Sequence, residues 1–272
     1  MTRLFRSDDR SVSLTREDRR EEKTQANPSA VVLKEALVSD FRFGELRERT
    51  LHKQLKALYR PEDGEAEWPV AGSIADLWSP TAGVIEIQTR SLSKLRPKLA
   101  AYLDAGLAVT VVHPLAVQRI IVTWNAAKDE VLSRRRSPKV ERVEASFREI
   151  GSIAGVLTHP RFRLVLALVR ESEHRSADGL GSWRRQGKSK VDRILDELTG
   201  ERVFASREDY AALLPSQWPQ PGTVAELAET LSLTGGEAQA LVSCLKKLGV
   251  LEVCGRRGRA HLLRRSGASF KT

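Results

Sequence analysis

The chain has 272 residues, more than one domain usually needs, so two domains with adequate cores are expected. Its formal net charge is +10 and its pI is about 9.9. Such a charge favours acidic partners, above all nucleic acid, because each phosphate that a protein neutralises releases counterions. The sequence has no run of about 18 apolar residues and no apolar stretch near its start, so we expect a cytoplasmic protein without a membrane span.

The two cysteines argue against a scaffold of disulfides or zinc. Cys244 and Cys254 form no CxxC pair and have no histidines at zinc-finger spacing. We expect both to be buried thiols.

The N-terminal part divides into a charged segment and a helix. Residues 1–36 carry many acidic and basic side chains but few large apolar ones, so we expect a flexible tail that cannot bury enough surface to fold. Apolar residues then recur at helical spacing. This pattern predicts a first helix over 43–59, with apolar positions at Leu46, Leu51, Leu55 and Leu58.

After this helix the pattern changes to that of strands. Three short strands with tight connections are followed by an amphipathic helix and by further apolar runs. A helix, a three-strand meander, a helix and a strand predict an α+β domain over 37–175 with mixed strand pairing. The expected strands are 66–70, 73–78, 84–89, 107–112 (ended by Pro114), 117–124 and 162–169, and the expected helix is 93–103.

The C-terminal part, 176–272, begins within the polar, glycine-containing segment 172–187, where we expect the domain boundary. A supporting helix is expected over 190–198. Two S/T-x-x-E capping boxes, at Thr223 and Thr234, each begin an apolar-periodic helix. Beyond them, 250–253 and 260–263 alternate like a hairpin around a turn at 255–258. Helix, turn, helix and hairpin together predict a winged helix.

The strand over 84–89 carries the residues of most chemical interest. Successive side chains point to opposite faces, so Glu86 and Gln88 share one face. The short turn before this strand lets Asp76 of the preceding strand lie beside Glu86. Two facing carboxylates repel unless a cation lies between them, and Mg²⁺ or Mn²⁺ is the ion expected there. The competing interpretation is plain alternation on a half-exposed strand.

These residues carry a family resemblance. Ser73-Ile-Ala-Asp76 and Val84-Ile-Glu86-Ile-Gln88 resemble the D…E-x-Q variant of the PD-(D/E)XK nuclease motif, as in CoiA-like nucleases. The resemblance covers roughly residues 43–125 and implies a restriction-endonuclease-like mixed sheet flanked by helices. It further implies that Asp76 and Glu86 bind the metal ion, and we expect Gln88 to orient the attacking water.

The motif departs from the usual family pattern at Gln88, where most members have lysine. An amide offers dipoles in place of a positive charge, so we expect another residue to supply that charge. Lys94 and Lys98 on the next helix are candidates, although lysines on a helix are more often surface cations. An acidic residue on the first helix, Glu48 or less favourably Glu45, would assist, with His52 one turn beyond Glu48.

Clusters of basic residues suggest where nucleic acid binds. One lies in the predicted hairpin, one at the end of the predicted recognition helix and one beside Trp183. Trp183 would either stack on a base or, more commonly for a tryptophan, pack against the neighbouring domain. The expected nucleic-acid-binding residues are Arg184, Arg185, Lys188, Lys246, Lys247, Arg256, Arg257 and Arg259, and a further basic run is Arg134, Arg135 and Arg136.

The hypothesis from the sequence is therefore a Mg²⁺- or Mn²⁺-dependent nuclease that acts on double-stranded DNA. RNA as substrate and a homodimer are left open. The alternative is a non-catalytic DNA-binding or regulatory protein that keeps a nuclease-like fold. The winged helix would also suit a protein-interaction or dimerisation role, although its basic residues favour nucleic acid.

Overall fold

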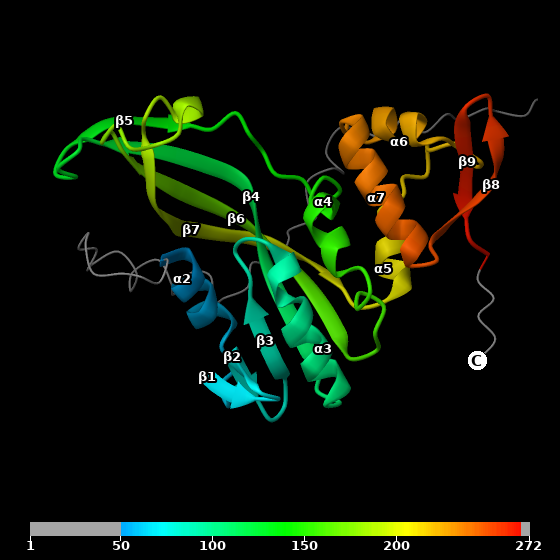
Figure 1. Ribbon diagram of the computed structural model, residues 1–272, viewed down its shortest axis with the longest axis horizontal. Coiled ribbons are helices and arrows are strands. Elements are labelled where there is room, and N and C mark those ends of the chain that lie inside the picture. Colours follow the sequence, from blue (N-terminus) through cyan, green and yellow to red (C-terminus); the bar gives the residue numbers. More distant parts are fainter. Residues whose placement is uncertain (1–49, 268–272) are drawn as a thin grey trace, which may run out of the picture. The chain divides into compact units, whose positions relative to one another are not determined.

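The computed structural model of the chain describes residues 50–267. These residues form a seven-stranded mixed sheet, a separate two-stranded hairpin and short helices against them (Figure 1). The large sheet has the strand order β1-β2-β3-β4-β6-β7, and β5 pairs with β4 as well. The α+β class and the mixed pairing expected from the sequence are confirmed. The proposed charged tail, 1–36, lies outside the described residues.

The first half of the sheet begins with helix α2, Thr50–Tyr59, and the strands β1, Glu65–Val70, β2, Ser73–Ser79, and β3, Gly83–Ile87. The three strands pair antiparallel in sequence order, as the predicted meander requires. The part of the predicted first helix before residue 50 lies outside the described residues.

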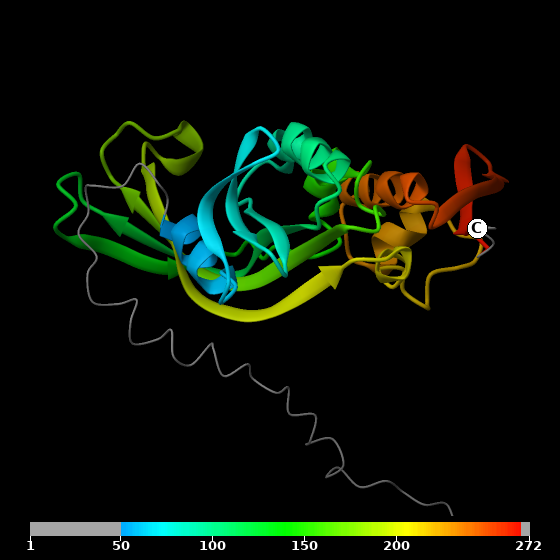
Figure 2. The same cartoon turned by 90° about the horizontal axis from the view of Figure 1, so that it is seen from below.

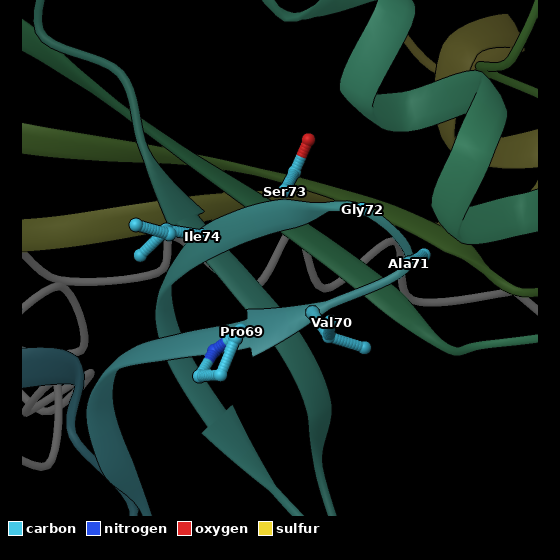
Figure 3. A pocket seen from close by; sticks show the side chains of 6 residues that line it. All are labelled: Pro69, Val70, Ala71, Gly72, Ser73 and Ile74. Carbon is cyan, nitrogen blue, oxygen red and sulfur yellow. The ribbon is translucent and has the colours of Figure 1, made fainter.

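The turn between β1 and β2 consists of only Ala71 and Gly72, both at positive φ, 47° and 73° (Figure 3). Two such residues between strands make a type I′ turn, whose twist matches that of an antiparallel pair. The Val70 and Ser73 pair closes it. A shallow hollow of about 360 Å³ at this turn is lined by residues 69–74, none of which is titratable.

Beyond β3, the chain forms a 3₁₀ turn, Leu92–Leu95, and helix α3, Arg96–Asp104, and then returns as β4, parallel to β3. Gly83 allows the two strands to approach. A Cβ at this position would lie 2.3 Å from the carbonyl oxygen of Ala108, and its φ of +74° disfavours other residues.

Strand β4 corrects one prediction. The two strands expected at 107–112 and 117–124 are one continuous strand, Val109–Trp124, and Pro114 lies inside it. Pairing with β3 ends at Val112 and pairing with β5 begins at Ile120. Between these points β4 has neither neighbour on that edge, where a proline without an N–H is tolerated.

Strands β5, Val131–Arg136, β6, Phe162–Ser176, and β7, Ser189–Phe204, complete the sheet. Strand β6 is parallel to β4, and β7 is antiparallel to β6 along nearly its whole length. The helix predicted over 190–198 is therefore wrong, because pairing with β6 overrides the helical preference of this short segment. The predicted boundary between 175 and 176 falls at the last residue of β6, and the division into domains stays a prediction.

Apolar side chains cover both faces of the sheet. On one face, Leu51 and Leu55 of α2 pack with Ile85 and Ile87 of β3. On the other face, Leu99 of α3 joins a larger buried cluster that continues into the C-terminal helices. Helices α2 and α3 thus lie on opposite sides of β3 (Figure 1).

The C-terminal helices are α4, Phe147–Ile150, α5, Arg207–Ala211, α6, Val224–Thr230, and α7, Gly235–Lys247. Both predicted capping boxes are confirmed, and Ser206 with Asp209 forms a third at α5. Phe147, Phe204 and Tyr210 stack and pack edge-on within the common core, with ring centroids 5.0–6.3 Å apart. None of the helices described in residues 50–267 is long and apolar enough to cross a membrane.

The hairpin after α7 consists of β8, Leu251–Arg257, and β9, Ala260–Arg265. Its turn lies at Gly258 and Arg259 and not over 255–258, because β8 continues through a register shift after Val253. Cys244 is buried as expected, but Cys254 on β8 is exposed, which corrects that prediction.

Candidate functional site

Strands β2 and β3 separate at Asp76 and Glu86. The last paired residues there are Leu77 and Ile85, so Asp76 and Glu86 are the next residues in register. In place of a further backbone pair, Asp76 Oδ2 accepts a hydrogen bond of 2.8 Å from the Ile87 backbone N–H. The end of the strand pair therefore positions the Asp76 carboxylate directly against β3.

Helix α2 supplies the other partners of Asp76. His52 Nε2 lies 3.3 Å and Lys56 Nζ 3.9 Å from Asp76 Oδ1. His52 and Lys56 are one helical turn apart, so both reach the same carboxylate from one face of the helix. The Asp76 side chain is 18% exposed, which leaves part of it accessible to solvent.

Helix α3 holds Glu86 from the opposite side of the sheet. Lys98 Nζ lies 3.0 Å from Oε1 and 3.3 Å from Oε2, and the Tyr102 hydroxyl donates to Oε1 at 3.0 Å. Glu86 is only 2% exposed, so it is a buried acid with partners and not a surface residue. This burial contradicts plain alternation on a half-exposed strand.

Lys98 also donates a 2.7 Å hydrogen bond to the backbone carbonyl of Ile74 on β2. One ammonium group therefore joins β2, β3 and α3 at the point where the carboxylates lie. Of the two lysines that the sequence offered, the structure places Lys98 at the acids. Lys94 is exposed and is not among the partners of Glu86.

The two acids have opposite electrostatic surroundings. Burial raises the pKa of Glu86, and the nearby charge of Asp76 raises it further, against the opposing effects of Lys98 and Tyr102. Burial also acts to raise the pKa of Asp76, but His52, the Ile87 N–H and Lys56 outweigh it and lower the pKa below its usual value. Asp76 thus keeps its charge while Glu86 holds a proton more readily, a split typical of acid pairs at functional sites.

Gln88 does not join the carboxylates through any hydrogen bond within the described part of the chain. Its backbone N–H donates to the Val112 carbonyl, and its carbonyl oxygen lies 2.5 Å from His113 Nδ1. Burial lowers the pKa of His113. The role of Gln88 in orienting water stays a prediction. Glu48 and Glu45 lie outside the described residues.

Two partners of the acids were missed by sequence reasoning. Lys56 follows His52 by four residues, and Tyr102 follows Lys98 by four residues. Because residues four apart share a helix face, the spacing alone was a usable signal in both cases.

Within residues 50–267, no three His, Cys, Asp or Glu side chains are grouped so that they would hold a metal ion together. The candidate donors are therefore the two carboxylates of Asp76 and Glu86. This set fits Mg²⁺ or Mn²⁺, which bind through one or two carboxylates and take their remaining ligands from water and substrate phosphates. The charge of Asp76 raises the pKa of Glu86, and a bound cation would offset this effect.

A second candidate surface lies between α7 and the β8–β9 hairpin. A groove of about 750 Å³ there is lined by apolar side chains together with polar and basic ones. Lys246 and Lys247, expected to bind nucleic acid, are among them, as is Arg259 at the turn of the hairpin. Its other polar lining residues include Gln239, Ser243 and His261.

The basic residues of the hairpin differ in their surroundings. Arg257 forms an ion pair of 2.6 Å with Glu226 and Arg264 one of 2.6 Å with Glu252. No ion pair among the described residues holds Arg256 or Arg259, which are both exposed. These two arginines are the ones most open to a phosphate.

The third basic cluster lies at the turn between β6 and β7. Arg184 and Arg185 belong to a short 3₁₀ turn with Trp183, and Lys188 follows before β7 begins. The sequence favoured packing of Trp183 against a neighbouring domain, but its side chain is 82% exposed, so that interpretation is wrong for the described part of the chain.

Comparison with known proteins places the chain among relatives without adding a function. It is 29% identical over 219 residues to an uncharacterized protein of Treponema pallidum (strain Nichols), a match that covers 80% of this chain and 86% of the relative. No solved structure matches the chain. Residues 49–205, which contain the whole large sheet and both acids, match the family model described as Domain of unknown function (DUF8091). Because this match spans more than half of the chain, the chain belongs to that family.

Proposed function

We propose that this protein is a Mg²⁺- or Mn²⁺-dependent nuclease that hydrolyses phosphodiester bonds in DNA. The observation that carries the proposal is that Asp76 and Glu86 are the next residues in register at the end of the β2–β3 pair, with the charge of Asp76 acting on Glu86 and Lys98 bonded to Glu86. The order of elements supports it. An antiparallel β1-β2-β3 meander, helix α3 and a strand β4 parallel to β3 follow the order that the resemblance to PD-(D/E)XK nucleases implies.

Asp76 and Glu86 would hold the cation. The chemistry that such an ion supplies when bound is a more acidic water and neutralisation of charge on the phosphate. The protein orients the two carboxylates and supplies a further positive charge. Tyr102 fixes the orientation of the Glu86 carboxylate, and His52 with the Ile87 N–H fixes that of Asp76. Lys98 brings the positive charge that the amide of Gln88 lacks.

The groove beside α7 supports binding of nucleic acid. Its two lysines lie in the last turn of α7, and Arg259 extends the positive charge onto the hairpin. Phosphate contacts of this kind fix a protein on nucleic acid without reading its sequence. A helix beside a hairpin also suits a winged-helix role for residues 206–265.

One observation favours the alternative of a non-catalytic nucleic-acid-binding protein. Each carboxylate already has a lysine beside it, Lys98 at Glu86 and Lys56 at Asp76, and the imidazole of His52 also lies against Asp76. A site that balances its charges in this way could be retained for stability alone.

Cleavage assays distinguish the nuclease proposal from the non-catalytic alternative. Plasmid, linear and branched DNA are incubated with the protein and Mg²⁺ or Mn²⁺, alongside Asp76→Asn, Glu86→Gln and the control Asp104→Asn, an exposed acid at the end of α3. The nuclease proposal expects cleavage that needs the metal, is lost in both site variants and persists in the control. DNA binding without cleavage of any substrate would support the alternative.

A further inference from the structure

The turn between β6 and β7 exposes two large apolar side chains. Leu180 is 86% and Trp183 82% exposed, more than any other large apolar residue in the described part of the chain. Single exposed apolar residues are common on proteins, but two within four positions at a hairpin end concentrate apolar surface at one point. Neither belongs to the acid site or to the groove beside α7.

Internal hydrogen bonds fix the conformation of this loop. The Gly181 N–H donates to the Gly187 carbonyl at 2.7 Å, which closes the loop on itself. Asp178 accepts hydrogen bonds from the Leu180 N–H at 3.0 Å and from the Ser189 hydroxyl. A Cβ at Gly181 would lie 1.9 Å from the Lys188 carbonyl oxygen, so glycine is required for this closure. A loop fixed in this way presents Trp183 with little ordering cost when a ligand binds.

The surroundings of Trp183 are cationic. The Arg184 guanidinium lies 5.5 Å from the centre of the Trp183 ring, within the range of a cation–π contact. Arg185 and Lys188 add two further positive charges. The acid within this loop, Asp178, is engaged in the loop's own hydrogen bonds. The loop therefore combines a flat aromatic ring with a net positive charge.

A second basic element lies at the same end of the sheet. Trp124 of β4 pairs with both Ser176 of β6 and Val131 of β5, so the β4–β5 and β6–β7 turns begin side by side. Both views place these turns together (Figures 1 and 2). Strand β5 carries three exposed arginines just beyond, Arg134, Arg135 and Arg136.

We propose that residues 177–188 form a stacking element for unpaired nucleotides, with Trp183 against a base and the arginines of this loop and of β5 along the phosphates. Aromatic rings among cations are how proteins bind single strands without sequence preference, because every base has a flat face. The inference rests on the proposed nucleic-acid function and refines its substrate class. The preferred substrate is DNA that contains a single-stranded segment, such as a fork or a frayed end.

The test measures binding without metal, so it does not depend on cleavage. Fluorescently labelled single-stranded, forked and fully paired oligonucleotides are titrated by anisotropy in EDTA. Trp183→Ala should weaken binding to the first two by roughly 5- to 150-fold, the range for loss of one stacked base. Trp183→Phe should keep most of the affinity. Val203→Ala, which removes an exposed apolar side chain elsewhere on β7, should change nothing.

A second readout reports stacking itself. Intrinsic tryptophan fluorescence should fall when the wild-type protein binds a single strand, and most of this quenching should be absent in Trp183→Phe. Gly181→Ala, which disrupts closure of the loop, should weaken single-strand binding as Trp183→Ala does.

Unchanged single-strand affinity in Trp183→Ala, or an equal loss on paired DNA, would overturn the inference. So would vesicles of anionic lipid that bind through Trp183 while oligonucleotides do not, since the loop would then be a membrane contact. A failure of the nuclease proposal can be told apart from a failure of this inference. Trp183-dependent binding of single strands without any cleavage would refute the nuclease proposal and leave this inference intact. Cleavage with no Trp183-dependent binding would refute this inference alone.

Discussion

At the scale of single residues, Lys98 is the side chain on which the proposed chemistry most depends. It is the cation bonded to both oxygens of Glu86, and it connects that acid to the Ile74 carbonyl on β2. A positive charge at this point can offset the negative charge that develops on a phosphate during hydrolysis.

Lys98→Met should therefore lower the rate of metal-dependent DNA cleavage by roughly 10²- to 10³-fold, the usual effect of removing one stabilising group. Lys94→Met, in the 3₁₀ turn just before α3 and exposed, is the matched control and should cleave like the wild type. Rates would be taken from single-turnover time courses, with thermal unfolding as a check on folding. Equal rates in the two variants would show that Lys98 has no part in the reaction.

The residues of this site could be predicted only in part. The alternation of Ile85, Glu86 and Ile87 was enough to place both isoleucines in the core and Glu86 on the other face. The choice between Lys94 and Lys98 could not be made from spacing, because it depends on where α3 crosses the strands. Trp183 could not be placed either, since its exposure follows from how its loop closes.

At the scale of elements, the far half of the sheet is held by buried ion pairs. Glu171 and Glu173 on β6 are each 1% exposed. Arg119 of β4 donates to Glu171 at 2.5 Å and to Glu141 at 3.1 Å. Arg193 of β7 donates to the Thr89 carbonyl just beyond β3, which connects this half of the sheet to the strand that carries Glu86.

Arg119→Met should destabilise the protein by about 3–5 kcal/mol, because it leaves the buried charge of Glu171 without its nearest partner. Arg170→Met is the control: its ion pair with Glu197 has both side chains about half exposed, so its loss should cost less than about 1 kcal/mol. Urea unfolding measures both free energies. Similar losses in the two variants would mean that burial does not set the strength of these pairs.

These elements also show where sequence patterns fail. The meander and α3 were predicted because each has its own local period. Strand β7 was mistaken for a helix because its stability comes from β6, which lies beside it only after folding. Pro114 ended a predicted strand for the same reason: only the completed sheet shows that β4 lacks a neighbour at that edge.

At the scale of the whole molecule, positive charge is spread over separate places: the groove beside α7, the β8–β9 hairpin and the turns at the end of the large sheet. Such a distribution suits a long, charged polymer that contacts several surfaces at once.

Replacing both Arg256 and Arg259 by glutamine should weaken DNA binding and make it less sensitive to salt. If each contacts one phosphate, the slope of log K against log salt should become shallower by roughly 2. Because Arg264 is already paired with Glu252, Arg264→Gln should alter the slope less. Anisotropy titrations over a range of salt give these slopes, and an unchanged slope in the double variant would exclude the hairpin from the DNA contact.

The central claim is that Asp76 and Glu86 together hold a divalent cation, and titration calorimetry with Mn²⁺ near neutral pH tests it most directly. The wild-type protein should bind Mn²⁺ with a heat that disappears in both Asp76→Asn and Glu86→Gln but remains in Asp104→Asn. Mn²⁺ binding that is the same in the wild type and in Glu86→Gln would contradict the claim and leave a nucleic-acid-binding protein whose two acids serve only its fold.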